Sequence, residues 1–445
     1  MPHLPVSNLT LILVIFFTYG QLLYAQTNQK VLGYIDEIYP ELWELYRHLH
    51  QAPELSMQEE KTARLIADQL TTLGFEVQEN MGAFNLAAVY RNGSGPVVLI
   101  RTDMDALPVR ESTGLAYASS ATGTNAAGDQ VSVMHACGHD MHMTVFLGTA
   151  RTMVEMRDRW QGTLIMVAQS AEETGMGANL FFKNGLYEKV PLPDYALALH
   201  CNPYLEAGKV GYRSGPLLAS VDMIDIEVLG EGGHGAAPHT TRDPVMLSAQ
   251  LIQSFQTIVS REVNPQEPAV VTVGSIHGGT VHNVIPDKVH LQLTVRSYSD
   301  VVRDQIIEAI ERRCRNLALA AGISEDKLPV IHIRDPHTPT TDNDPVLTER
   351  LVQVFQQELG AENVEEMPKY TFGEDFSRYG IQDHKVPICL YWLGTVDPEK
   401  VEAARQGGPE LPSLHSPFYA PIPEPSIRTG VRTMTAAAFN LFGSK

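Results

Sequence analysis

The stretch TLIMVAQSAEE, residues 163–173, sets the expected architecture, because a short apolar run ends here at an acidic turn. An uninterrupted run of this length is typical of a strand that is buried on both faces of a sheet. The runs VVLIRTD (97–103) and DYALALH (194–200) have the same character, and segments with helical periodicity, residues 35–49 and 62–73, precede them. Strands that alternate with helices predict an α/β fold, with a mixed sheet covered by helices on both faces.

From residue 219 the order becomes strand, helix, strand, strand, helix, strand, and it continues to residue 335. This order is typical of a self-contained two-layer unit of the ferredoxin-like α+β type. The later run VPICLYWLG (386–394) again reads as a buried strand and is expected to rejoin the first sheet. We therefore expect a larger domain, residues 26–218 and 336–445, interrupted by an inserted domain, residues 219–335.

The composition is that of a globular protein, since 44% of the 445 residues are hydrophobic and 19% are charged. At about 100–200 residues per domain, this length indicates two or three domains. The net charge of -19 argues against nucleic acid or anionic membranes as main partners, because their phosphate groups repel an acidic protein. The 4 cysteines are too few for a disulfide scaffold.

The N-terminus carries the apolar run LTLILVIFFTYG, residues 9–20. This run has the length of a signal-peptide core and is shorter than the about 20 residues that span a bilayer. We expect a signal peptide of residues 1–25, cleaved near Ala25, and a secreted or periplasmic mature protein without a stable membrane anchor. An uncleaved anchor helix is the alternative.

The densest group of metal-binding side chains is MHACGHDMH, residues 134–142. Cysteine and histidine side chains this close together in a loop can bind one metal ion, and the alternative is a buried cysteine with hydrogen-bonded neighbours. Glu172 and Glu173 follow the strand that ends at Ser170, at the sheet edge where open α/β sheets hold their sites. Adjacent carboxylates point in different directions, so one can bind metal while the other moves protons; a solvated acidic turn is the alternative.

Other ligand-type side chains recur at predicted strand ends. His200 ends the run 194–200, and Asp103 and Asp105 lie at and just beyond the end of the run 97–103. The aspartates can orient imidazoles or act as turn residues, and His200 and His415 taken singly would be structural. Their repeated placement favours a metal site. GxSxG, P-loop and HExxH motifs are absent, and the glycine-rich GEGGHGAAPH lacks the context of a nucleotide site.

Taken in order, these blocks resemble the amidohydrolase branch of the co-catalytic dimetal carboxypeptidase family, which includes hippurate hydrolases, N-acyl-amino-acid amidohydrolases and auxin–amino-acid conjugate hydrolases. The matching segments run from residue 47 to 419: RHLHQAPELSMQEEKTA, RTDMDALPV, HACGHDMHM, QSAEETGMGA, HCNPYLEAGKVG, GEGGHGAAPHTTRDPV, GGTVHNVIPDKV, GEDFSRY and LHSPFY. Three positions depart from the family pattern: Ser170 stands for a proline, Thr174 for a glycine and Gly373 for a serine. These departures spare the implied ligands and bear on substrate choice.

The resemblance implies two divalent metal ions, with Glu172 as the general base. The implied metal ligands are Cys137, His139, Glu173, His200 and His415. It also implies that the inserted domain is a lid that forms a homodimer, in which His234 reaches the neighbouring subunit's site and helps to polarise the scissile carbonyl. Asn283 and Arg296 would hold the substrate's carboxylate. A thiolate ligand favours zinc, with manganese or cobalt compatible.

The implied reaction is metal-dependent hydrolysis of N-acyl amino acids, hippurate-like or related, to a carboxylic acid and a free amino acid. Metal binding lowers the pKa of water to about 7, and a positioned carboxylate then moves its proton. A metallo-carboxypeptidase or dipeptidase is the first alternative. A non-catalytic metal-binding or scaffold protein on the same fold, and a hydrolase that uses Cys137 as nucleophile, are the others.

Overall fold

The computed structural model describes residues 7–443, with side chains described from residue 29 onward. Helix α1 (Ser7–Gln51) opens the chain. The signal peptide expected at residues 1–25 falls outside the described residues in its first six positions and in all of its side chains, so its cleavage near Ala25 stays a prediction. Within the described part of the chain, no helix combines the length and the hydropathy that a bilayer crossing requires.

The larger domain is built on one mixed sheet, whose strand order is β1-β2-β6-β3-β7-β18-β8-β17. The central strands β6, β3, β7 and β18 run parallel to their neighbours in that group. In chain order the strands are β1 (Glu76–Gln78), β2 (Leu86–Asn92), β3 (Val97–Asp103), β6 (Gly162–Gln169), β7 (Tyr195–Glu206), β8 (Val210–Tyr212), β17 (Val364–Glu366) and β18 (Ile388–Val396).

Helices cover both faces of this sheet, which confirms the predicted α/β class. One face packs against α1, α2 (Glu60–Thr72), α3 (His139–Glu155), α8 (Pro345–Leu359) and α11 (Pro423–Phe442), and the apolar side chains of these helices form the largest core. The other face packs against α4 (Gly177–Lys183), α5 (Leu186–Lys189) and α9 (Arg378–Ile381). Helix α10 (Pro398–Arg405) lies beside β7.

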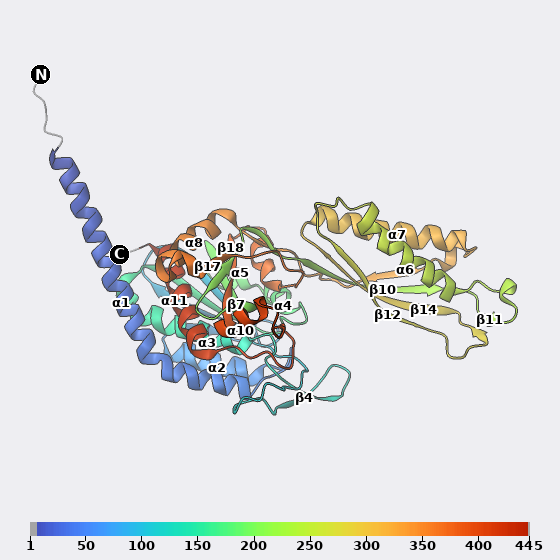
Figure 1. Cartoon of the computed structure of the whole chain (residues 1–445), viewed down its shortest axis with the longest axis horizontal. Coiled ribbons are helices and arrows are strands. Elements are labelled where there is room, and N and C mark those ends of the chain that lie inside the picture. The colour runs from blue at the N-terminus through green and yellow to red at the C-terminus, as the bar shows by residue number, and fades with distance from the viewer. Residues whose placement is uncertain (1–6, 444–445) are drawn as a thin grey trace, which may run out of the picture.

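The smaller domain is a separate lobe, and a narrow neck of strands joins it to the larger domain (Figure 1). Its sheet has the order β12-β14-β10-β15, all antiparallel, with two helices packed on one face. This is the ferredoxin-like arrangement expected from the element order. The elements are β10 (Ser220–Leu229), α6 (Pro244–Arg261), β12 (Val270–Gly278), β14 (Lys288–Ser297), α7 (Asp300–Ala320) and β15 (Val330–Ile333).

Short strand pairs complete the fold. At the neck, β9 (Gly215–Leu218) pairs with β16 (Thr341–Asn343), so the chain leaves and re-enters the larger domain at adjacent points. At the far end of the smaller domain, β11 (Gly233–His234) pairs with β13 (Val284–Ile285). The hairpin of β4 (Thr122–Thr124) and β5 (Gln130–Ser132) extends from the larger domain (Figure 1).

The parallel strands bring the predicted site residues to one sheet edge. In the register of the sheet, Asp103 at the end of β3 is level with Gln169 at the end of β6. Strand β7 differs from the expectation, because it continues beyond His200 to Glu206 instead of ending there. The reason is tertiary: β18 pairs with β7 as far as Glu206, well past the last pair between β3 and β7.

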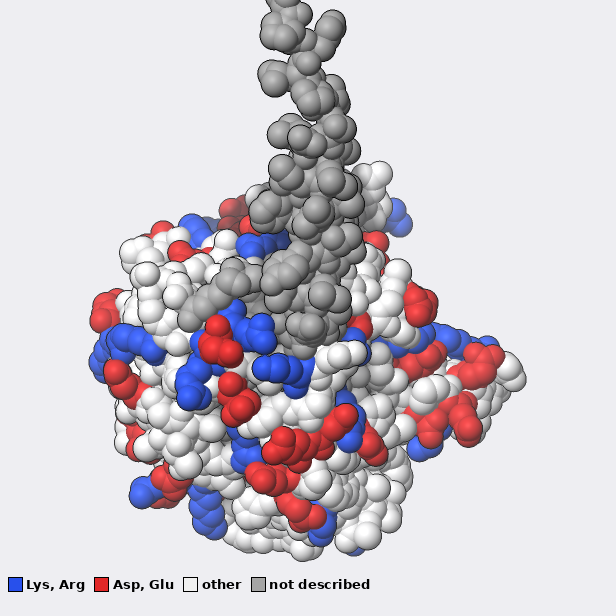
Figure 2. Space-filling view, turned by 90° about the vertical axis from the view of Figure 1, so that its left-hand side faces the viewer, with Lys and Arg blue, Asp and Glu red and all other residues white. Residues whose placement is uncertain are grey.

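The charges of the larger domain are mixed on the end that lies away from the smaller domain. Figure 2 shows Lys and Arg interspersed with Asp and Glu over the described part of this face. Ion pairs such as Arg151–Glu41 and Arg432–Glu358 join its helices. The Arg151–Glu41 pair is open to solvent on its Glu41 side and contributes little to stability, so apolar burial is the main force that holds these helices together.

A buried ionic triad links the end of α1 to the start of α3. His50 contacts Asp140 through Nδ1 at 2.7 Å and Glu111 through Nε2 at 3.1 Å, and the three side chains are almost fully buried. Burial alone lowers the pKa of His50, but the hydrogen bonds that His50 donates to Asp140 and Glu111 outweigh it and raise this pKa to about 10. His50 is therefore charged at neutral pH and neutralises two carboxylates, Glu111 and, within the motif 134–142, Asp140.

We predict that His50→Gln destabilises the protein by about 3–5 kcal/mol at pH 6, because two buried carboxylates lose their cation. His50 binds its proton more tightly in the folded state, with a pKa of about 10 against about 6.5 unfolded. Its contribution is complete below about pH 6.5 and is lost as the pH rises toward 10. Chemical unfolding across this range measures it, with His48→Gln, an exposed neighbour, as control. A pH-independent difference would contradict the charged triad.

Candidate metal centre

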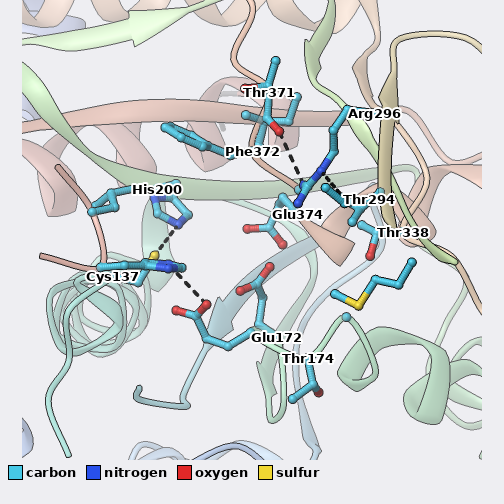
Figure 3. Close-up of a pocket in the computed structure, with 18 of the residues that line it drawn as sticks. Cys137, Glu172, Thr174, His200, Thr294, Arg296, Thr338, Thr371, Phe372 and Glu374 are labelled. Carbon is cyan, nitrogen blue, oxygen red and sulfur yellow. Dashed lines mark hydrogen bonds and ion pairs between the residues drawn. The ribbon is translucent and has the colours of Figure 1, made fainter. Parts of the chain in front are cut away.

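A sharp turn before α3 places the first two donors. Gly138 is left-handed, with φ +80, and a Cβ on it would lie 3.0 Å from the sulfur of Cys201. The loop can therefore pass close to β7 only with glycine at this position. The turn directs Cys137 and His139 toward His200, and Cys137 Sγ lies 3.5 Å from His200 Nε2 (Figure 3). Ligand atoms of these three residues all lie within 4.8 Å of one another.

The remaining two donors join this group through Glu173. Its Oε1 is 3.9 Å from His139 Nε2, and its Oε2 is 3.3 Å from His415 Nε2. The loop that carries His415 is tied to the motif by a hydrogen bond from the His415 backbone N–H to the carbonyl of Ala136. Cys137, Glu173 and His415 form a second group within 4.8 Å. The structure thus brings all five sequence-predicted ligands into one continuous cluster.

The donor atoms are oriented as a metal site requires. His139 Nδ1 donates to the carbonyl of Asp105 at 2.8 Å, and His200 Nδ1 donates to the carbonyl of Cys201 at 2.9 Å. A carbonyl only accepts, so a neutral ring keeps its Nε2 lone pair directed into the cluster. His139 Nε2 and Glu173 Oε1 are buried and have no hydrogen-bond partner among the described residues. Unpartnered buried polar atoms are costly, and a divalent cation fits this set of nitrogen, sulfur and oxygen ligand atoms.

The pKa shifts of Cys137, Glu173 and His139 all point in one direction, toward protonation. Burial, with Glu173 and Glu172 nearby, raises the pKa of the Cys137 thiol well above its usual range. Burial raises the pKa of Glu173 to about 8. Burial disfavours the charged form of His139, yet Asp103 and Asp105 raise its pKa to about 10. Each shift favours the uptake or retention of a proton, and a bound cation would take over that role and deprotonate the thiol.

Glu172 lies between the metal donors and a second carboxylate group. It approaches His139 and Glu173 on one side and Glu374 and Asp375 on the other. Burial, followed by Glu374 and Glu173, raises its pKa well above the usual range. A carboxylate whose basicity is raised in this way can accept a proton from water near neutral pH.

Arg101 is the buried cation of this second group. It contacts Asp103 at 2.6 Å, Glu374 at 3.0 Å and Asp375 at 3.1 Å. Both residues lie in segments that match the family pattern, RTDMDALPV and GEDFSRY, although the sequence pattern predicted no role for Arg101 or Glu374. The signal that could have found them is a charged side chain inside an apolar strand, since such a charge needs partners of opposite sign.

Asp103 and Asp105, which were expected to orient imidazoles, each contact a histidine, but they do so in different ways. Asp103 accepts from His142 Nδ1 at 2.6 Å, and the other ring nitrogen of His142 accepts the Cys201 backbone N–H at 2.8 Å. Both nitrogens of His142 are therefore in use, and it supports the site without binding metal. Asp105 orients His139 through its backbone carbonyl, while its side chain accepts the backbone N–H of Glu173 at 3.0 Å.

A cavity of about 510 Å³ opens beside the cluster, and both domains line it. Arg296 of β14 lies across this cavity from Cys137 and His200 (Figure 3). It donates to Thr294 Oγ1 at 3.1 Å and to the carbonyl of Thr371 at 3.4 Å, and no carboxylate of the described residues forms an ion pair with it. Apolar walls come from Leu218, Val221, Met223, Val270, Phe372, Trp392 and Leu414.

His234 and Asn283 do not reach this cavity within one chain. Both are exposed at the far end of the smaller domain, where the backbone N–H of Gly235 donates to the carbonyl of Asn283 at 2.8 Å. The structure therefore separates them from Arg296, which was expected to share the substrate's carboxylate with Asn283.

The three family departures have local explanations. Ser170 uses the N–H that a proline would lack, donating it to Asn85 Oδ1 at 2.7 Å. Thr174 and Gly373 line the cavity. A Cβ on Gly373 would collide with Cγ2 of Val221, so the valine methyl fills the space where a larger residue would stand.

Comparison with known proteins gives a consistent set of matches. The model of peptidase family M20/M25/M40 matches residues 99–438. An N-acetyldiaminopimelate deacetylase of Limosilactobacillus fermentum is 36% identical over 373 residues, covering 82% of this chain and 91% of that protein. Thermostable carboxypeptidase 1 of Saccharolobus solfataricus is 34% identical over 376 residues, covering 84% and 90%. The crystal structure of a Bacillus subtilis protein, described as a dinuclear metal binding peptidase from the M20 family, has a TM-score of 0.73 at 27% identity, covering 92% and 99%.

We predict that zinc raises the free energy of unfolding of the chelator-treated protein by about 4 kcal/mol when the free zinc concentration is a thousand times the dissociation constant of zinc. Glu173→Gln is expected to have opposite effects on the metal-free and the zinc-bound protein. It stabilises the metal-free protein by removing a buried carboxylate, and it reduces the gain from zinc by removing a ligand. Thermal unfolding with and without zinc measures both effects, and Glu362→Gln, on the exposed surface, is the control. An equal zinc effect in the wild type and in Glu173→Gln would remove Glu173 from the ligand set.

Proposed function

The chain belongs to peptidase family M20/M25/M40, and from this premise we propose that it hydrolyses the amide bond of N-acyl amino acids, releasing a carboxylic acid and a free amino acid. Hydrolysis of amide bonds is the shared chemistry of the relatives. The observation that carries the proposal is one cavity with the five-donor cluster and Glu172 on one wall and Arg296 on the other.

Two divalent metal ions bound by the five donors would supply Lewis acidity for the substrate carbonyl and acidity for the attacking water. Glu172 takes the proton of that water. The hydroxyl bonds to the acyl carbon, the C–N bond breaks, and Glu172 returns the proton to the departing nitrogen. Glu374 and Asp375 maintain the basicity of Glu172, since their charges favour its protonated form.

Arg296 favours an amino acid as the leaving half of the substrate. A guanidinium binds a carboxylate through two parallel hydrogen bonds, and an amino-acid product carries such a carboxylate. Burial lowers the pKa of Arg296 only from a value far above neutrality, so the group stays charged. The apolar walls near Phe372 and Leu414 suit an apolar acyl group.

Three further features belong to the same proposal. The exposed tip that carries His234 and Asn283 suits a homodimer in which each smaller domain completes the partner's cavity. The thiol and imidazole donors favour zinc over manganese and cobalt. The apolar run at residues 9–20 supports export by a signal peptide, followed by activity outside the cytoplasm.

Carboxypeptidase or dipeptidase activity is the second candidate, and one observation favours it. Arg296 can bind the C-terminal carboxylate of a peptide in the same way as the carboxylate of an N-acyl amino acid. A carboxypeptidase is also among the relatives. The two candidates differ in the group that precedes the scissile bond, which carries a free amine in a dipeptide.

We predict that the zinc-reconstituted protein cleaves N-acetyl and N-benzoyl amino acids with higher kcat/KM than the matching dipeptides. Glu172→Gln lowers kcat by about 10²–10⁴, the usual worth of a positioned acid–base, while the zinc content per chain is unchanged. Amino-acid release and metal analysis measure the two quantities. Preference for dipeptides would select the carboxypeptidase alternative, and a variant that keeps more than about a tenth of kcat would remove Glu172 from the role of base.

We predict that Gly373→Ser raises KM for N-acyl amino acids by about tenfold with a smaller effect on kcat. The added side chain displaces Val221 beside Arg296, and overpacking of this kind costs about 1–3 kcal/mol. Val221→Ala in the same chain makes room for the serine and restores KM. Steady-state kinetics of the single and double variants measure this, and a double variant as impaired as Gly373→Ser would show that the pair does not shape the pocket.

A further inference from the structure

The segment of residues 47–63 matches the family pattern, yet it supplies no metal ligand and no acid–base group. Three of its polar side chains nevertheless reach elements that carry the site. His50 contacts Asp140, Ser56 Oγ donates to Asp105 Oδ2 at 2.5 Å, and Glu59 Oε1 accepts the backbone N–H of Ala171 at 2.7 Å. Glu59 is the member of this group that contacts the turn bearing Glu172.

The turn of residues 170–177 has a conformation that its own sequence does not favour. Ala171 is left-handed, with φ +55, a region that residues with a Cβ seldom occupy. Its carbonyl accepts the backbone N–H groups of Met176 and Gly177, which closes the turn. Glu172 follows Ala171 directly, so the backbone angles at Ala171 set the position from which the side chain of Glu172 extends.

External side chains hold this turn at separate places. Asn85 accepts the N–H of Ser170, Glu59 accepts that of Ala171, and Asp105 accepts that of Glu173. Two of these contacts act on different residues of the turn. Asp105 holds the backbone of the metal ligand Glu173, whereas Glu59 holds the residue just before Glu172.

We propose that Glu59 is a positioning residue for Glu172: its carboxyl fixes the left-handed backbone at Ala171 and thereby the direction of the catalytic carboxylate. The inference rests on the proposed role of Glu172 as base. Glu59 itself belongs neither to the residues that line the cavity nor to the candidate metal donors, and it is fully buried at 0% exposure.

The second oxygen of Glu59 supports this assignment. Oε2 is buried and has no hydrogen-bond partner among the described residues, so the contact from Oε1 to Ala171 is what ties this carboxyl to the turn. Burial, with Asp105 nearby, raises the pKa of Glu59 to about 8, which makes the neutral acid its main form at pH 7. A neutral acceptor of the same shape, the amide of glutamine, should therefore replace it.

The test compares Glu59→Ala with Glu59→Gln in the zinc-loaded enzyme. Glu59→Ala is expected to lower kcat by about 10- to 100-fold with KM and zinc affinity unchanged, because Asp105 still holds Glu173. Glu59→Gln retains kcat within about threefold. Glu60→Ala truncates the same type of side chain at the adjacent, exposed position and serves as the matched control.

A second readout does not depend on catalysis. Hydrogen exchange of the peptide that contains Ala171 is expected to accelerate in Glu59→Ala and to stay slow in Glu59→Gln. If the wild type cleaves no amide, the proposed function fails, and the exchange data still test the contact. The inference is overturned if Glu59→Ala keeps wild-type kcat and exchange, if it loses kcat, zinc and thermal stability together, or if Glu59→Gln is as impaired as Glu59→Ala.

Discussion

The burial of many carboxylates at one sheet edge is the constraint on which the rest of the structure depends. Asp103, Asp105, Glu172, Glu374 and Asp375 are all shielded from water, and Arg101 is the arginine that lies among them. Isolated charges are too costly in such a place, so each carboxylate must find a proton, a cation or backbone N–H groups. Three features of the structure meet this need: the metal donors, the His50 triad and the hydrogen bonds to the 170–177 turn.

Much of the fold could be predicted because its signals are local. Uninterrupted apolar runs indicated the central strands, and the change of rhythm near residue 219 indicated the ferredoxin-like lobe. The extension of β7 past His200 could not be predicted, because it depends on pairing with β18, almost two hundred residues away in the chain. A strand's length is decided by its neighbours as much as by its own residues.

In the site, too, local motifs could be predicted whereas tertiary contacts could not. Cys137, His139 and the Glu172–Glu173 pair stand in short motifs, and the structure brings them together with His200 and His415. The residues that orient them were harder to identify. Glu59 and Asn85 act on the turn through backbone N–H groups, and such a contact requires only an acceptor at the right place, which leaves no spacing rule in the sequence.

The neck formed by β9 and β16 has a mechanical consequence. Arg296 and Val221 belong to the smaller domain, whereas Glu172 and the metal donors belong to the larger one, and the cavity lies where the two face each other. A ligand that touches both walls must therefore favour the neck geometry that brings them together, and by reciprocity a neck held in that geometry must bind the ligand more tightly. For such a ligand, affinity depends on the geometry of the neck as well as on the residues of the two walls.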